Sequence, residues 1–179
     1  MDLKPLRRAV LALCLPLATA VWGAEGLNEA LGAYSRGDYP GAVQLLQPLA
    51  QKGDAEAQTR LGLMYFHGQG VREDDDTAFA WIRRAALQGH AKAQYHLGNF
   101  YALGHGVPRE EKDPDRMAAR WYFESAQQGN ADAQYALGLL FLSGKGVVQN
   151  AEEARRWFTR AANAGHADAQ RFLADFTAR

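Results

Sequence analysis

Cysteine is almost absent from this chain, which has 179 residues and a single cysteine, Cys14, near its start. An internal disulfide needs two cysteines at bonding distance, so the fold must be stabilised by packing instead. An excess of either charge is also missing, because 20 Lys and Arg balance 20 Asp and Glu. Nucleic-acid binding calls for a basic face, so we expect no nucleic-acid partner.

Catalytic and metal-binding signatures are missing as well. The serines are Ser35, Ser125 and Ser143, and none is followed three residues later by the lysine typical of penicillin-recognising enzymes. The histidines never show His-x-x-x-His spacing, and no Cys-x-x-Cys pair exists, so the common zinc-ligand patterns do not occur. We therefore expect no catalytic residue, no metal and no cofactor.

Long hydrophobic runs are missing except near the N-terminus, where an apolar run over residues 9–17 follows Lys4, Arg7 and Arg8. A run this short does not span a bilayer, and with a basic flank it is typical of a cleaved secretory signal. We expect residues 1–24 to be a signal peptide, with its cleavage site open. The mature chain is then predicted to be periplasmic, or secreted further, without stable membrane insertion.

What the sequence does contain is a repeated segment. It starts at Ala55, recurs from Ala91 and Ala131, and begins again at Ala167, at spacings of 36, 40 and 36 residues. Periods in this range are typical of stacked helical hairpins. Each hairpin buries its apolar face only against its neighbours, so the sequence predicts an all-α fold, an α-solenoid with terminal capping helices.

Each repeat carries the same two-helix pattern. In the first helix, Ala57, Leu61 and Tyr65 form one apolar stripe, and the glycine pair Gly68 and Gly70 ends the helix at little cost. A tryptophan recurs at one position of the second helix, which favours a role in the core over a ligand cage. These tryptophans are Trp81, Trp121 and Trp157.

The residue before each first helix varies between repeats. Asp54 and Asn130 are good N-caps, whereas His90 and His166 are poorer ones. Because the two histidines occupy equivalent repeat positions, we interpret their role as structural.

The pattern divides the chain into consecutive units. These are a degenerate hairpin (25–53), three full repeats (54–89, 90–129 and 130–165) and a C-terminal capping helix (166–179). In the degenerate hairpin, Gly37-Asp-Tyr39 followed by Ala42 resembles a tetratricopeptide turn. The second repeat has four extra residues, which produce a charged, proline-containing loop over 108–115. Insertions map to loops that often lie on a binding face, although a tolerated insertion without a partner stays the alternative.

These residues together resemble the Sel1-like repeat family, a branch of the tetratricopeptide-type solenoids. The family pattern is Ala-x-x-x-Leu-Gly-x-x-Tyr-x-x-Gly-x-Gly-Val, then Ala-x-x-Trp, then Ala-Ala-x-x-Gly. The resemblance covers residues 54–179, with Phe141 in a tyrosine place and Ser125 in an alanine place. It implies a scaffold that binds other proteins. One cysteine-rich branch is described as having β-lactamase activity, but this chain lacks the cysteines of that branch.

In related hairpin solenoids the first helices line the concave side, so the non-core positions of these helices are candidates for binding. Aromatic residues are enriched in interfaces, and several occur in this row, which also includes Thr59, Lys92 and Leu103. The predicted partner-binding residues are Tyr34, Leu63, Phe66, His67, Tyr95, Asn99, Tyr135 and Leu139. Contact with the neighbouring repeat is the alternative explanation for them, and Lys92 is expected to form ion pairs with Glu56 and Asp132.

The sequence thus predicts an exported, non-enzymatic scaffold, a monomer that holds another protein or peptide in the groove of an envelope complex. Two alternatives stay open. One is a β-lactamase-like or cell-wall-active hydrolase, and the other is a secreted effector that binds a host protein.

Overall fold

The computed structural model describes residues 15–177, and within that range it contains nine helices and no strand. The helices are α1 (Leu15–Ser35), α2 (Tyr39–Gln51), α3 (Ala55–His67), α4 (Asp75–Leu87), α5 (Ala91–Leu103), α6 (Pro114–Gln127), α7 (Ala131–Ser143), α8 (Ala151–Asn163) and α9 (Ala167–Thr177). Apart from the start of α1, the predicted signal segment 1–24 and its Cys14 lie outside the described residues.

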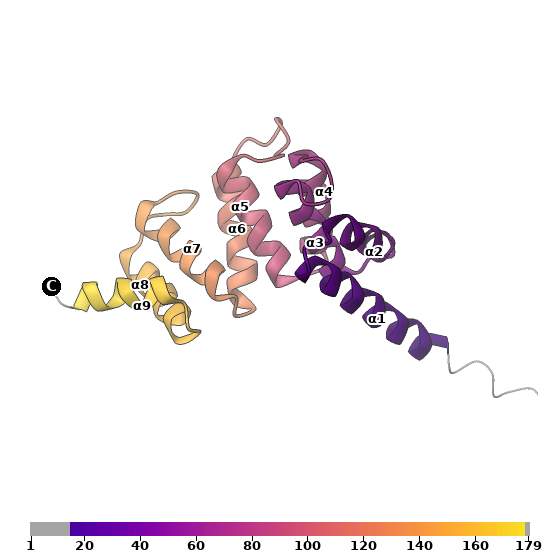
Figure 1. The fold of residues 1–179 in the computed structure, drawn as a ribbon. Coiled ribbons are helices and arrows are strands. Elements are labelled where there is room, and N and C mark those ends of the chain that lie inside the picture. The colour runs from indigo at the N-terminus through magenta and orange to yellow at the C-terminus, as the bar shows by residue number, and fades with distance from the viewer. Residues whose placement is uncertain (1–14, 178–179) are drawn as a thin grey trace, which may run out of the picture.

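The helices pack as consecutive antiparallel hairpins, each against the next (Figure 1). Helices α1 and α9 lie at opposite ends of the array, and the first helices α3 and α5 touch one another directly. The predicted all-α solenoid is therefore confirmed. Among the described helices, none has both the length and the hydropathy that crossing a bilayer requires.

The helix boundaries follow from local chemistry. Asp54 accepts a hydrogen bond from the amide of Ala57 at 2.7 Å, and Asn130 accepts one from Ala133 at 2.9 Å. His90 makes no such bond, in line with its weaker capping propensity. The first helices end at a glycine in the left-handed region, as at Gly104 with φ 77°, a conformation that costs glycine little.

A glycine inside each first helix sets how closely the two helices of a hairpin approach. A Cβ on Gly98 would lie 2.6 Å from the ring of Tyr122, far inside normal contact. The same arrangement pairs Gly62 with Ile82 and Gly138 with Phe158. The residue after each tryptophan therefore packs on the first helix of its own repeat.

The tryptophans themselves are in or beside the core. Trp121 and Trp157 are 8% and 5% exposed, whereas Trp81 is half-buried beneath the guanidinium of Arg84. Ser125, which departs from the family's alanine pair, is fully buried and donates to the carbonyl of Ala91 at 2.7 Å. Its hydroxyl is therefore satisfied.

The second glycine of each pair joins one repeat to the one before it. Gly106 and Gly146 lie so close to the backbone of Asp75 and Asp115 that any Cβ would clash with a carbonyl oxygen. The residue between the glycines reinforces this contact. The contacts of these linking residues are Gln69 with Tyr34 at 3.0 Å, His105 with Asp75 at 2.8 Å and Lys145 with Asp115 at 3.2 Å.

A buried glutamine in each first helix links three helices through polar contacts. Gln58 donates to the carbonyl of Ala50 at 2.9 Å and accepts from Gln88 at 2.7 Å. Gln94 repeats this arrangement with Ala86 and Gln128. In the third repeat Gln134 donates to the carbonyl of Ala126. The position of Gln88 and Gln128 is occupied here by Ala164, which has no side-chain donor. The Gln134 Oε1 atom is therefore buried without a hydrogen-bond partner.

Candidate functional site

A hollow of about 240 Å³ lies between α3 and α5, on the face formed by the first helices. We call this surface of α3, α5 and α7 the first-helix face. The hollow is lined by Leu63, Phe66, His67, His96, Asn99, Phe100, Leu103 and His105. Four of the eight predicted binding residues, Leu63, Phe66, His67 and Asn99, are thus brought together at one place.

Aromatic rings form the floor of this hollow. The rings of Phe66 and Phe100 are tilted with centroids 5.1 Å apart, and the His105 ring meets Phe66 edge-on at 5.1 Å. Phe100 is 4% exposed and belongs to the core. Because these rings hold each other in place, the floor is a rigid apolar surface.

One wall of the hollow carries neutral polar groups. Burial lowers the pKa of His96 to about 4, so this imidazole is uncharged at neutral pH. The hydroxyl of Tyr122 donates to Asn99 Oδ1 at 2.7 Å. Burial raises the pKa of Tyr122 well above its usual value, so the hydroxyl keeps its proton and fixes the Asn99 amide with its NH₂ group free to donate.

His105 is held from outside the hollow by the preceding repeat. Its Nδ1 lies 2.8 Å from Asp75 Oδ2, and a carboxylate can only accept, so Nδ1 carries the proton. None of the residues that line the hollow is a carboxylic acid. The hollow therefore combines an apolar floor with imidazole and amide groups.

The other four predicted residues lie elsewhere. Tyr34 donates to Gln69 and packs edge-on against Tyr39, and Tyr135 stacks on His166 at 4.4 Å. These two tyrosines contact neighbouring repeats or loops, as the alternative explanation proposed. Tyr95 is half-buried with its ring 6.0 Å from that of Tyr122, and Leu139 is 42% exposed.

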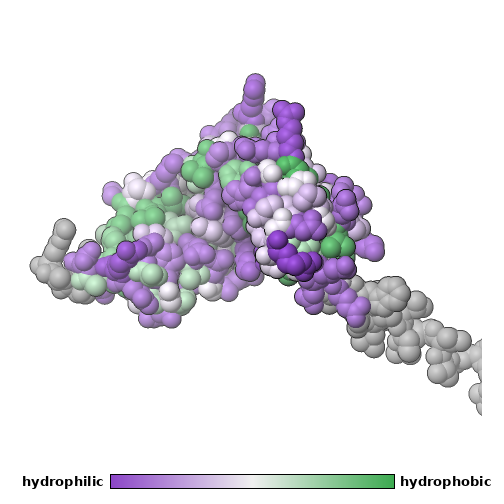
Figure 2. Space-filling model, in the orientation of Figure 1, coloured by the Kyte–Doolittle hydropathy of each residue, from purple (hydrophilic) through white to green (hydrophobic). Residues whose placement is uncertain are grey.

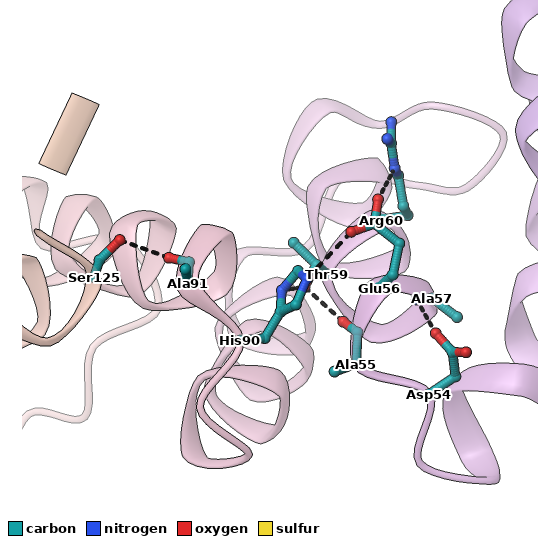
Figure 3. Close-up of polar contacts among 9 residues, drawn as sticks. All are labelled: Asp54, Ala55, Glu56, Ala57, Thr59, Arg60, His90, Ala91 and Ser125. Atoms are coloured by element: carbon teal, nitrogen blue, oxygen red, sulfur yellow. Dashed lines mark hydrogen bonds and ion pairs between the residues drawn. The ribbon is translucent and has the colours of Figure 1, made fainter. Parts of the chain in front are cut away.

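Two expectations for the non-core positions of the first helices were wrong. Thr59 is buried, and its hydroxyl lies 2.6 Å from the carbonyl of Ala55 and 3.0 Å from Nδ1 of His90 (Figure 3). Lys92 makes no ion pair within the described part of the chain. The carboxylates expected to bind Lys92 have other partners. Glu56 pairs with Arg60 at 2.7 Å and with His90 at 3.3 Å, and Asp132 lies 3.6 Å from His166.

The predicted set omitted four residues that line the hollow, namely His96, Phe100, Leu103 and His105. For Leu103 the sequence carried a signal, since it occupies the repeat position of His67 and is apolar. For Phe100 and His105 the sequence carried no such signal. Phe100 belongs to the core, and His105 lies in the turn between Gly104 and Gly106. Residues 15–177 contain no group of three His, Cys, Asp or Glu side chains that could hold a metal ion.

Comparison with known proteins agrees with this architecture. The family model described as Sel1 repeat matches residues 55–90, 91–130 and 131–166. A Sel1 repeat protein from Oxalobacter formigenes superposes with a TM-score of 0.73 at 32% identity, over 80% of this chain and 57% of that one. The c5321 protein, a protective antigen present in uropathogenic Escherichia coli strains, gives a TM-score of 0.75 at 28% identity, over 90% of this chain and 35% of that one.

A curated relative shares a shorter segment. The ERAD-associated E3 ubiquitin-protein ligase component HRD3A of Arabidopsis thaliana is 39% identical over 64 residues, which is 34% of this chain and 9% of the relative. The chain thus spans only part of each of these proteins.

Proposed function

The chain belongs to the Sel1 repeat family, and from this premise we propose that it is an adaptor that holds a segment of another protein on its first-helix face. The Sel1 repeat solenoid is a fold typical of protein–protein interaction scaffolds, and proteins of this family are generally non-enzymatic. The HRD3A relative is itself a component of a larger ligase, which supports a role in assembly.

The observation that carries the proposal is exposed apolar surface on the first helices. Leu103 at the rim of the hollow is 69% exposed, and Leu139 on α7 is 42% exposed. Figure 2 shows apolar surface over the region of α7, while much of the remaining visible surface is hydrophilic. Exposed apolar surface beside a preformed hollow commonly marks an interaction site.

The proposed setting is an envelope complex outside the cytoplasm. The basic and apolar pattern of residues 1–24 supports export, and the antigenic character of the c5321 protein supports exposure outside the cell. In this setting the protein acts as a monomer that presents its first-helix face to a partner.

A matched pair of variants tests the proposal. Leu103 and Leu87 are each the last residue of a 13-residue helix, and they are 69% and 59% exposed. Only Leu103 lines the hollow. Both substitutions place a negative charge at the C-terminal end of a helix, where it is unfavourable with the helix dipole. Leu103→Asp and Leu87→Asp should therefore lower the stability of the fold to a similar extent.

The measurement is a crosslinked pull-down from envelope extract with both variants beside the wild type, read by mass spectrometry. We expect a partner that is retained by the wild type and by Leu87→Asp but lost by Leu103→Asp. Equal retention by both variants would place the interface elsewhere and remove the proposed role of the first-helix face.

A further inference from the structure

Four side chains of α5 lie along one line of the helix surface. Lys92, His96, Asn99 and Leu103 are spaced by four, three and four residues, so they share one stripe of the helix. The last three line the hollow, and Lys92 lies about one turn beyond His96, roughly 6 Å along the axis. The stripe thus leads from a cation into the hollow.

The charge of Lys92 acts on the Glu56 carboxylate only at longer range than an ion pair. Lys92 is exposed and makes no ion pair among the described residues. The nearby carboxylates are already engaged, since Glu56 pairs with Arg60 and His90, and Asp132 lies 3.6 Å from His166. No carboxylic acid lines the hollow, and Asp75 behind it is bound to His105. Lys92 is therefore available to form an ion pair with an acidic side chain of a partner.

The hollow itself suits an uncharged side chain. Its floor is formed by Phe66 and Phe100, and the neutral His96 adds no charge. A volume of about 240 Å³ is enough for one bulky apolar side chain but not for several. The free NH₂ group of Asn99, fixed by Tyr122, lies at the hollow and can donate to a peptide carbonyl.

From these observations we propose that the first-helix face binds an extended peptide segment with one bulky apolar side chain in the hollow and an acidic side chain two residues away on Lys92. In an extended chain, side chains two residues apart point the same way and are about 7 Å apart. The axial distance from Lys92 to Asn99 is about 10 Å, and the flexible lysine side chain spans the difference. Asn99 donates to the peptide backbone next to the apolar side chain in the hollow. This inference rests on the proposed function and specifies its ligand chemistry.

The test uses synthetic peptides, capped at both ends, in an NMR titration of the full chain. The first peptide has the core Asp-Ala-Phe-Ala-Asp. It carries an acid on each side of Phe because the peptide could run in either direction along α5. The second replaces Phe by Ala, and the third replaces both Asp by Lys. We expect the Phe peptide to shift the side-chain amide signal of Asn99. The Ala peptide should bind at least about tenfold more weakly, and the Lys peptide about threefold to fivefold more weakly.

Two protein variants separate the anchors. Lys92→Gln should abolish the preference for Asp over Lys while the preference for Phe over Ala is unchanged. Asn99→Ala should weaken all peptides and keep both preferences. Leu87→Asp, which lies off the stripe, should bind like the wild type, and thermal melting of each variant checks that it is folded.

The proposal is overturned if no peptide shifts the signals at millimolar concentration, if Phe and Ala peptides bind equally, or if Lys92→Gln keeps the charge preference. These failures are distinct from failure of the adaptor role. A partner lost by Leu103→Asp in the pull-down, with no peptide binding, would leave the adaptor function standing and remove only this ligand chemistry.

Discussion

The junction between the first and second repeats differs from the one between the second and third. At the first, His90 stands at the N-cap of α5 but binds Thr59 and Glu56 of the preceding repeat (Figure 3). At the second, Asn130 occupies the same repeat position and caps its own helix through Ala133. One position of the repeat can therefore either start a helix or join two hairpins, depending on its side chain.

The two junctions also differ in the residue of the preceding repeat that faces His90 or Asn130. The first junction has Glu56 where the second has Lys92, so only the first offers a carboxylate to a histidine. The third junction combines both roles, because His166 lies 3.6 Å from Asp132 and stacks on Tyr135, and it also accepts a hydrogen bond from the amide of Ala169 in its own helix at 3.3 Å. The second junction thus leaves Lys92 without an ion pair among the described residues. Lys92 lies about one turn from His96, which lines the hollow that we propose as the binding site.

The largest expected effect comes from the central core. Trp121 is 8% exposed within the central core. Trp121→Ala should lower the free energy of unfolding by about 3–5 kcal/mol, because it removes a large buried ring and leaves a cavity. Urea denaturation measures this, and wild-type-like unfolding of the variant would show that the tryptophan is not a core residue.

The second prediction addresses the two junctions directly. His90→Ala removes the contacts with both Thr59 and Glu56, and should cost about 2 kcal/mol at roughly 1 kcal/mol for each contact. Asn130→Ala removes one capping bond and should cost about 1 kcal/mol. Urea denaturation of both variants gives the ranking, and a larger loss for Asn130→Ala would contradict the distinction between joining and capping.

A third change makes the last full repeat resemble the first two. Ala164→Gln supplies the donor that Gln134 Oε1 lacks, in the place where Gln88 and Gln128 act in the other repeats. It should stabilise the protein by about 1 kcal/mol, since a buried acceptor gains a hydrogen bond. The melting temperature reports the gain, and Ala164→Leu is the control that adds bulk without the bond. Equal melting of the two variants would argue against the hydrogen bond.

The smallest expected effect is the contribution of Glu56, at the first junction, to the pH dependence of stability. The hydrogen bond with His90 is the largest cause that lowers the pKa of Glu56 from 4.5 to about 2. As the pH falls, the unfolded chain takes up this proton first, so the stabilisation by Glu56 is complete above about pH 4.5 and is lost towards about pH 2. Solvent screening keeps it below about 1 kcal/mol.

Urea denaturation at several pH values in this window checks the sign. The wild type should lose more stability on acidification than Glu56→Gln does. Lys92→Gln should lose only a small part of this pH dependence, because the charge of Lys92 is the smallest of the causes that lower the pKa of Glu56. A wild type and Glu56→Gln with the same pH profile would show that the carboxylate is not held as the structure has it.

Part of the candidate site could be predicted before the fold was known. Leu63, Phe66, His67 and Asn99 were found because counting along a helix of known period separates core positions from surface positions. Thr59 was misplaced by the same counting, since the imidazole of His90 from the next repeat covers it. Helical period alone does not show what a neighbouring hairpin places on a surface.

The sequence by itself determined the repeat, the hairpin and the order of the helices, because these depend on contacts within one period and on the local conformations of glycine and capping residues. Only the tertiary structure decided where the hollow lies and which polar groups stay free. The floor joins Phe66 of one repeat to Phe100 of the next, and Asn99 is oriented by Tyr122 of the following helix. Such contacts depend on how closely neighbouring helices approach, because a Cβ on Gly98 would clash with Tyr122 in the same hairpin and a Cβ on Gly106 would clash with Asp75 in the preceding one.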